Sequence, residues 1–266
     1  MSTLISWLSI AALCAVLAMA ALYVFQGKLL YPAPTRDAAP AVPAGLERMA
    51  LGDGFGVLLP PAKTADGPAP AMIFAHGNGE AATHWLDAFE VLRDAGLAIL
   101  VVEYPGYAGA VGKPSQRSIG QTMVAAFEHL AMRDDIAATR VIAYGRSLGG
   151  GAVSELARQR PLAAIAYESS FTTLAAVVRE KGFPAFLLRD RFDNTAVIAR
   201  GTTPTFVFHG TEDVVIPFHH ARGLAAAGAH VRLYSAACGH NDCPRPWQQL
   251  LDFLRDVPGF LNAKAV

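Results

Sequence analysis

The stretch Gly145-Arg146-Ser147-Leu148-Gly149 carries more information about the fold than any other part of the chain. It follows an apolar run that predicts a strand over 140–144, and it opens a segment that predicts a helix over 147–159. The pattern G-x-S-x-G between a strand and a helix is typical of a nucleophile elbow, a strained turn that exposes a serine hydroxyl. Side chains at positions 145 and 149 would clash with the neighbouring helix and strand, so we expect glycine to be required at both. A glycine-rich turn with an incidental serine is the alternative interpretation.

Short apolar runs alternate with helical stretches on both sides of this turn. The predicted strands cover 55–59, 71–75, 98–103, 140–144, 163–167, 205–209 and 230–234. The predicted helices cover 81–95, 118–132, 147–159, 217–227 and 246–255, and Ser118-Ile-Gly-Gln121 predicts a capping box for the second. This alternation predicts an α/β fold with a mostly parallel sheet covered by helices on both faces. Functional side chains then lie at the carboxyl ends of the strands.

Two other predicted strand ends carry the side chains that a serine nucleophile needs. Asp213 follows the strand over 205–209, and His240 follows the strand over 230–234. A serine hydroxyl needs a base to take its proton, and the base needs an acid to orient it. The chain order Ser147, Asp213, His240 is the order that belongs to this type of elbow. We therefore predict that these three residues form a catalytic triad.

The other acidic and histidine side chains near these positions receive structural interpretations. Glu212 precedes Asp213 but points the opposite way, and Asp242 lies too close in sequence to His240 to orient its ring. We expect His209 to make a structural hydrogen bond and the adjacent His219 and His220 to point apart. We expect the other histidines to lie at the surface or to be partly buried: His84, His129 and His230. Since no spacing indicates a zinc site, we expect neither a metal ion nor a cofactor.

The oxyanion of an acyl-transfer reaction needs two backbone N–H donors. One is predicted to come from Leu148, which follows the serine. The other is predicted to come from the loop after the strand over 71–75, which contains His76-Gly77-Asn78-Gly79-Glu80. The glycines on either side of Asn78 allow the backbone to turn its amide into the site. We assign the N–H of Asn78 as the second donor, with Gly79 as the alternative.

The N-terminal segment is apolar over 4–25, interrupted by Ser6 and Ser9. As a helix these 22 residues would span ~30 Å, the thickness of a bilayer core. A cleaved signal peptide ending at Ala18-Met-Ala20 is the alternative, but the apolar run continues past that site and no basic residue precedes it. We predict an uncleaved single-pass membrane anchor over 1–30. The nearby charges do not determine which side of the membrane the rest of the chain occupies.

Residues 31–45 are predicted to form an extended spacer, because four prolines lie between positions 32 and 43. The globular domain over 46–266 would thus stand a little off the membrane. Within it, 171–200 forms a short cap that contains Phe183-Pro-Ala-Phe-Leu-Leu188 among basic residues. We expect this apolar stretch to pack on the domain, with a lid over an acyl chain as the alternative.

Composition excludes several classes of protein. Of 266 residues, 53% are hydrophobic and 17% charged, which supplies a core and excludes general disorder. The 22 basic and 22 acidic residues give zero net charge, so nucleic-acid binding is not expected. The three cysteines are too few for a disulfide scaffold. Cys238 and Cys243 flank His240, and a bridge between them would indicate an oxidising compartment. We nevertheless expect two separate thiols, because the turn that aims His240 inward holds the sulfur atoms apart.

With these residues in view, the chain resembles the α/β-hydrolase superfamily. Within it, the chain is similar to the membrane-anchored α/β-hydrolase-domain proteins with one N-terminal transmembrane helix, which are related to serine aminopeptidase-like hydrolases. The resemblance is carried by Leu29-Leu-Tyr-Pro32, His76-Gly-Asn78, Glu103-Tyr-Pro-Gly-Tyr107, Gly145-Arg-Ser-Leu-Gly149, Glu168-Ser-Ser-Phe171, His209-Gly-Thr-Glu-Asp213 and Gly239-His-Asn241. The loop Ala108-Gly-Ala-Val-Gly112 departs from it, because this loop in the family usually carries a serine.

The resemblance implies a serine hydrolase that cleaves an ester, thioester or amide through an acyl-enzyme on Ser147. A carboxylic ester or thioester with a small or lipid-like acyl group is the expected substrate. Amide cleavage of the aminopeptidase type is one alternative. A membrane-anchored scaffold or chaperone-like protein with vestigial catalysis is the other, and the complete set of predicted catalytic residues argues against it.

Overall fold

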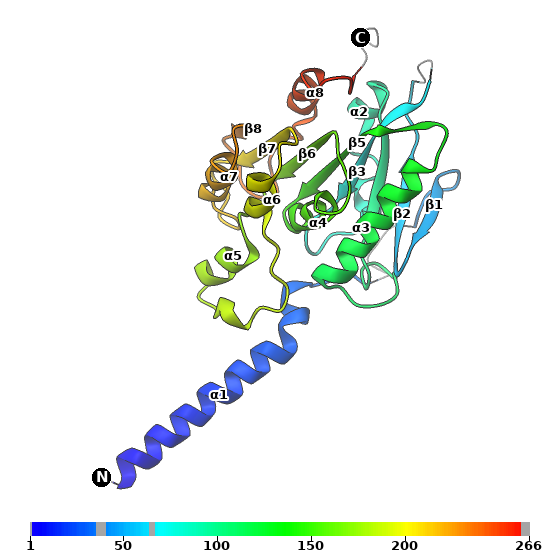
Figure 1. The fold of residues 1–266 in the computed structure, drawn as a ribbon. Helices are drawn as coiled ribbons and strands as arrows, with labels where there is room; N and C mark the ends of the chain where they lie inside the picture. Colours follow the sequence, from blue (N-terminus) through cyan, green and yellow to red (C-terminus); the bar gives the residue numbers. More distant parts are fainter. Residues whose placement is uncertain (1, 36–40, 64–66, 262–266) are drawn as a thin grey trace.

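The computed structural model describes residues 2–35, 41–63 and 67–261, and it contains one eight-stranded sheet (Figure 1). Its strands are β1 (Glu47–Leu51), β2 (Gly54–Leu59), β3 (Ala69–Ala75), β4 (Ala98–Glu103), β5 (Ile136–Arg146), β6 (Ala164–Glu168), β7 (Thr205–Gly210) and β8 (Val231–Ala236). They lie in the order β1-β2-β4-β3-β5-β6-β7-β8. Strand β2 runs antiparallel to both of its neighbours, and all other adjacent pairs are parallel. The predicted α/β fold with a mostly parallel sheet is confirmed.

Helices cover both faces of this sheet (Figure 1). They are α1 (Ser2–Leu30), η2 (Ala82–Trp85), α2 (Glu90–Asp94), α3 (Gln116–Ala131), α4 (Leu148–Ala157), α5 (Leu174–Glu180), η3 (Ala185–Leu187), α6 (Asn194–Arg200), α7 (His219–Ala225) and α8 (Trp247–Arg255). One core lies between the sheet and α3, α4 and α7, and a second lies between the sheet and α2 and α8. Successive side chains of the central strand β3 alternate between them, since Ile73 joins the first core and Phe74 the second.

All seven predicted strands are present, but three local predictions were wrong. Strand β1 was missed, because an edge strand that buries only Met49 and Leu51 carries a weak apolar pattern. The helix predicted over 81–95 is divided into η2 and α2, and the chain bends between them so that Trp85 and Phe89 both contact Phe74. The N-cap of α3 is Ser115, whose hydroxyl accepts a hydrogen bond from the N–H of Ser118, so the capping box predicted at Ser118 does not form.

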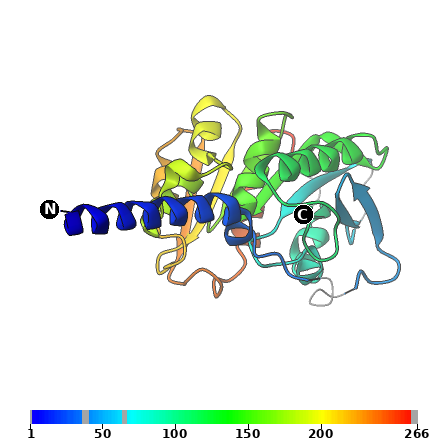
Figure 2. The same ribbon diagram turned by 90° about the horizontal axis from the view of Figure 1, so that it is seen from below.

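Helix α1 extends away from the sheet domain, and its residues 3–30 are apolar and long enough to cross a membrane (Figures 1 and 2). Its contacts with the other described residues lie at its C-terminal end. The side chain of Gln26 is buried against the cap, where its Nε2 donates to the carbonyl oxygen of Leu187 (3.0 Å) and its Oε1 accepts from the N–H of Arg189 (2.9 Å). Just beyond the helix, the hydroxyl of Tyr31 donates to Asp190 at 2.7 Å.

The described part of the predicted proline-rich spacer, residues 31–35, is not free of the domain, and the expected distance between domain and membrane stays a prediction. The carbonyl oxygen of Pro34 accepts a hydrogen bond from the N–H of Ala108 at 3.0 Å, so the chain after α1 runs along the domain. Residues 36–40 of the predicted spacer lie outside the described residues. Proline content alone does not determine whether an extended segment is free or packed, because packing depends on the surface beside it.

Candidate active site

The serine of the G-x-S-x-G stretch lies in a strained turn between β5 and α4. Ser147 has φ +52° and ψ −115°, outside the regions that residues with a side chain ordinarily adopt. A Cβ atom on Gly145 would collide with the backbone of Gly149, and one on Gly149 would collide with the carbonyl oxygen of Ala75. The predicted requirement for glycine at both positions is confirmed.

A short chain of buried hydrogen bonds holds this turn. The N–H of Ser147 donates to the carbonyl oxygen of Glu168 (2.8 Å), and the hydroxyl of Ser170 donates to the carbonyl oxygen of Ser147 (2.9 Å). Behind Ser170 lies Asn194, at the start of α6, whose amide donates to the Ser170 hydroxyl (3.2 Å) and accepts from Ser154 in α4 (2.8 Å). The elbow is thereby linked to the cap through groups that are removed from solvent.

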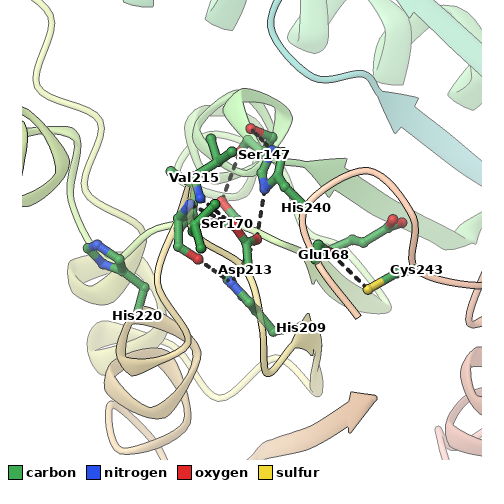
Figure 3. A network of polar contacts seen from close by, with 12 residues as sticks. Ser147, Glu168, Ser170, His209, Asp213, Val215, His220, His240 and Cys243 are labelled. Carbon is green, nitrogen blue, oxygen red and sulfur yellow. Dashed lines mark hydrogen bonds and ion pairs between the residues drawn. The ribbon is translucent and has the colours of Figure 1, made fainter. Parts of the chain in front are cut away.

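The structure brings Ser147, His240 and Asp213 together at the carboxyl ends of β5, β8 and β7 (Figure 3). Nε2 of His240 lies 3.2 Å from Oγ of Ser147, and Nδ1 of His240 lies 2.7 Å from Oδ2 of Asp213. The carboxylate of Asp213 is buried, and only 9% of the His240 side chain is exposed. The predicted nucleophile, base and acid therefore lie within hydrogen-bonding distance of one another, in the order that general-base activation of a hydroxyl would require.

The carboxylate of Asp213 is surrounded by donors (Figure 3). Its Oδ1 accepts from the N–H groups of Val215 (2.9 Å) and Ile216 (2.8 Å), and its Oδ2 lies 3.2 Å from Nε2 of His209. Burial acts to raise the pKa of Asp213, but the hydrogen bonds from His209, His240 and Ile216 outweigh it and hold the pKa well below its usual value. Asp213 is thus ionised at any pH at which His240 acts as a base.

The acidic and histidine residues next to Asp213 and His240 lie partly where the sequence predicts. Glu212 is exposed, and the carboxylate of Asp242 accepts from the N–H of Gly239 at 2.7 Å within the loop that carries His240. His209 makes the expected structural bond, since its Nε2 lies 2.7 Å from the carbonyl oxygen of Ile216. Its additional contact with Asp213 was not anticipated, because a histidine inside a strand gives no sequence signal for the residue behind it.

The loop that contains Asn78 lies beside Ser147, and both Asn78 and Leu148 border the same cavity as the serine. The side chain of Asn78 is fixed on both sides: its Nδ2 donates to the carbonyl oxygen of Leu30 (2.7 Å), and its Oδ1 accepts from the hydroxyl of Tyr107 (2.6 Å). Gly79 follows with φ +73° and does not border the cavity. The assignment of the Asn78 and Leu148 amides as oxyanion donors remains a prediction.

A buried pair supports this loop from below. His76 and Glu103 are both fully buried, with Nε2 of the histidine 2.9 Å from the carboxylate and its Nδ1 2.8 Å from the carbonyl oxygen of Gly77. Burial alone would lower the pKa of His76, but the charge of Glu103 and the hydrogen bond to it raise the pKa above its usual value. A charged histidine donates from both ring nitrogens, which fixes the direction of the chain as it enters the loop.

Comparison with known proteins agrees with this geometry. No family model matches the chain. An uncharacterized protein of Mycobacterium tuberculosis is 32% identical over 256 residues, which cover 91% of this chain and 89% of that protein. The human α/β hydrolase domain-containing protein 17B is 30% identical over 179 residues, which cover 64% of this chain and 60% of that protein.

A solved structure of an α-β hydrolase from Vibrio vulnificus superposes with a TM-score of 0.69 at 17% identity, covering 86% of this chain and 92% of that one. The chain therefore has the α/β-hydrolase fold. A second structure with the same fold, an esterase from Thermogutta terrifontis, superposes with a TM-score of 0.63 at 18% identity, covering 83% of this chain and 95% of that one.

Arg146 is the residue of this site that sequence analysis missed most clearly. It occupies the first variable position of G-x-S-x-G and is only 3% exposed. Its Nη2 donates to the carbonyl oxygen of His240 (2.7 Å) and to Oδ1 of Asn241 (2.7 Å), and its Nη1 donates to Glu80. The guanidinium therefore joins the elbow, the predicted oxyanion loop and the His240 loop. A charged residue between a buried strand and a buried helix was the available signal.

The structure contains a disulfide between Cys238 and Cys243, with Cα atoms 5.1 Å apart. The expectation of two separate thiols was wrong. Gly239 and Asp242 close a tight turn between the cysteines, so the loop carries His240 inward and still returns the second sulfur to the first. The bridge closes a small ring around the histidine, and Cys14 in α1 is free.

The expectation that His219 and His220 point apart was also wrong. Their rings stack with centroids 4.5 Å apart, and both Nε2 atoms meet the carboxylate of Glu180 at 2.9 and 3.1 Å. Nδ1 of His220 accepts from the N–H of Thr172 (3.2 Å), so the proton of a neutral His220 lies on Nε2 and is donated to Glu180. Hydrogen bonds therefore satisfy this cluster, and they tie the end of α5 in the cap to α7.

An apolar cavity of about 440 Å³ opens at Ser147. Its walls come from α1, from the cap and from the loop after β7. The lining residues of the cap are Phe171, Leu174, Val177, Val178, Lys181, Phe183, Pro184, Leu187 and Leu188. The expectation that 183–188 packs on the domain holds for Leu188, which is buried, but not for Phe183 and Phe186, which are 51% and 70% exposed. The cap here borders a cavity and does not only cover the sheet.

We predict that the disulfide around His240 stabilises the fold and keeps the base in position. In the chain-entropy model, a loop of this length contributes ~2 kcal/mol. Reduction, or the substitution Cys243→Ser, should lower the melting temperature by ~4–8 °C. It should also lower the rate of any hydrolysis that depends on His240. A Cys14→Ser variant is the matched control and should respond to reductant as the unsubstituted chain does. Three free thiols in denatured, unreduced protein would contradict the bridge.

Proposed function

We propose that this chain is a membrane-anchored serine hydrolase that cleaves a carboxylic ester through an acyl-enzyme on Ser147. The observation that carries the proposal is the hydrogen-bonded series Ser147 Oγ, His240 and Asp213, with separations of 3.2 and 2.7 Å, at the mouth of an apolar cavity. A thioester has the same acyl group and a better leaving group, so it belongs to the same proposal.

In the proposed mechanism, His240 takes the proton of Ser147 as its Oγ attacks the substrate carbonyl. The backbone N–H groups of Leu148 and Asn78 stabilise the negative charge that develops on the carbonyl oxygen. The C–O bond of the ester breaks, and the leaving alkoxide receives the proton from His240. A water molecule then gives a proton to His240 and attacks the acyl carbon, which releases the acid and restores the serine. Asp213 keeps His240 in the required tautomer and stabilises its cation.

The comparisons support ester chemistry. Several solved structures with this fold are of esterases, among them an acetyl xylan esterase from Paenibacillus and the Thermogutta terrifontis enzyme. The latter esterase has also been solved in a form phosphoramylated by tabun. Organophosphorus reagents that modify an activated serine are therefore suitable probes for this chain as well.

The cavity argues against the aminopeptidase-type alternative. A substrate with a free α-ammonium group needs an acidic partner, whereas Lys181 is the only charged side chain among the described residues that line the cavity. The scaffold alternative would require catalysis to be lost, and the hydrogen bonds at Ser147 and Asp213 favour a competent nucleophile.

We predict that Ser147→Ala abolishes hydrolysis of a short p-nitrophenyl ester without unfolding the protein. Loss of the nucleophile should lower kcat/KM by ~10³-fold or more, since only the oxyanion donors and binding remain. The measurement is initial rate together with the melting temperature of both proteins. A fluorophosphonate should label the unsubstituted protein and not the variant. Normal turnover by folded Ser147→Ala would refute the assignment of the nucleophile.

We predict that Asp213→Asn lowers kcat by ~10³-fold or more. An amide whose oxygen keeps the N–H bonds of Val215 and Ile216 would present its NH₂ group to His209 and His240. A donor facing Nδ1 of His240 favours the tautomer that cannot accept the serine proton. The adjacent Glu212→Gln is the matched control, and its rate should stay within about twofold because Glu212 is exposed. An equal loss in both variants would show that the acid has been assigned wrongly.

The membrane part of the proposal rests on α1. We predict that the full chain sediments with membranes and is released by detergent but not by high salt, because apolar insertion is insensitive to ionic screening. The disulfide supports a position of the hydrolase domain on the oxidising side of that membrane. Fractionation tests whether the chain is attached to a membrane, and N-terminal sequencing tests whether the segment is cleaved. A mature N-terminus at Ala21 in the soluble fraction would instead identify a cleaved signal peptide.

A further inference from the structure

One wall of the cavity at Ser147 is the membrane helix itself. The lining residues of α1 are Leu22, Gln26, Leu29 and Leu30. Their spacing of four, three and one residues places them on one face of the helix. The opposite face in the same turns carries Val24, which does not border the cavity, although Val24 and Leu29 are equally exposed at 62%. The C-terminal end of α1 thus presents one face to the cavity, and its opposite face points away from the cavity.

Specific hydrogen bonds hold this wall in place. Gln26 is the polar residue on the cavity face, and its amide is bonded to backbone groups of Leu187 and Arg189 in the cap. The last carbonyl of the helix, at Leu30, accepts from the side chain of Asn78 in the predicted oxyanion loop. A helix that served only as a tether would not need a buried glutamine matched to the cap, since a polar group in an apolar segment is costly unless it is paired.

The length of α1 puts this wall at the membrane surface. A helix of 29 residues is ~43 Å long, whereas the hydrocarbon core of a bilayer is ~30 Å thick. About nine residues therefore extend beyond the core. If the span begins at the N-terminal end of α1, these are residues 22–30, which include all four residues of the cavity wall. The cavity then lies at the depth of the interfacial region, where the ester groups of lipids are found.

The rim of the cavity is apolar as well. Phe183 of the cap and Val215 of the loop after β7 line the cavity and are exposed, and Phe186 and Val214 lie beside them with large exposed fractions. The guanidinium of Arg189 lies 5.5 Å from the ring of Tyr23, close to the level at which a lipid phosphate would occur. Exposed apolar side chains around an opening, next to a membrane helix, favour contact with lipid over contact with water.

We propose that the last turns of α1 are part of the substrate site, and that α1 and the cap together bind the acyl chain of an ester that resides in the same bilayer. This inference rests on the proposed hydrolase function and adds the substrate class and the route of entry. The acyl chain lies between α1 and α5 with its carbonyl at Ser147, and the alcohol part leaves toward His240. The anchor is then a specificity-determining element as well as a tether.

The test uses the full chain in detergent and p-nitrophenyl esters of acetate, hexanoate, octanoate and dodecanoate. Each methylene that enters the cavity should raise kcat/KM by up to about fourfold. Leu29→Trp places a bulky ring on the cavity wall and should lower the ratio of dodecanoate to acetate kcat/KM by about tenfold or more. Val24→Trp adds the same ring to the opposite face and should leave the ratio unchanged. Leu29→Ala widens the cavity and should move the preference toward longer chains, which guards against misfolding of the tryptophan variant.

The outcomes separate the inference from the function on which it rests. If the unsubstituted protein neither reacts with a fluorophosphonate nor hydrolyses the acetate ester, the proposed function fails and the inference fails with it. If it does both but Leu29→Trp, Leu29→Ala and Val24→Trp share its chain-length profile, the inference alone is overturned. A shift confined to the two Leu29 variants supports it.

A second arm tests the route of entry. The full chain is reconstituted in phosphatidylcholine vesicles, and a diacylglycerol is included either in the same vesicles or in separate, protein-free vesicles. Release of fatty acid should be at least about tenfold faster when protein and substrate share a bilayer. The water-soluble acetate ester is the control and should be hydrolysed equally in both mixtures. Equal rates of fatty-acid release in the two arrangements would overturn entry from the bilayer.

Discussion

The positive φ of Ser147 is the constraint on which the rest of the site depends. A residue with a side chain held in this way costs ~1–3 kcal/mol, so the surrounding structure must determine it. Here the backbone of Ser147 is bonded on one side to β6 and on the other to Ser170 and the first turn of α4. Because these partners come from segments far apart in sequence, the elbow forms only when the sheet and the cap are assembled. The exposed hydroxyl is a product of the whole fold and not of the five-residue stretch alone.

Arg146 makes the position of His240 depend on the same assembled fold. Its guanidinium is buried between carboxylates of Glu80 and Glu168 and also donates to the loop of His240. A second arginine, Arg245, reaches Glu168 from the segment after the disulfide loop. Buried charges are tolerated because they are paired and hydrogen-bonded, and removing one member would leave an uncompensated charge that typically destabilises by ~3–5 kcal/mol. The same contacts that stabilise the domain therefore fix the distance between Ser147 and His240.

The parts that could be predicted from the sequence are those encoded locally. Strand and helix periodicity predicted the sheet, and three short segments at strand ends predicted that Ser147, Asp213 and His240 lie close together. The parts that could not be predicted depend on contacts between distant segments. The docking of Gln26 on the cap, the meeting of His219 and His220 at Glu180, and the pairing of Cys238 with Cys243 each require a turn or surface that the local residues do not specify.

Contacts between distant segments also change how the N-terminal segment is interpreted. From sequence, an apolar run followed by prolines predicts an anchor and a spacer, two parts that act independently of the enzyme. In the structure the end of that run is one side of the cavity at Ser147, and Gln26 and Leu30 are bonded to the cap and to the loop of Asn78. A motion of α1 relative to the cap would therefore change both the width of the cavity and the position of a predicted oxyanion donor. In the proposed arrangement, membrane attachment and substrate binding share residues at the end of α1, so a substitution there would alter both.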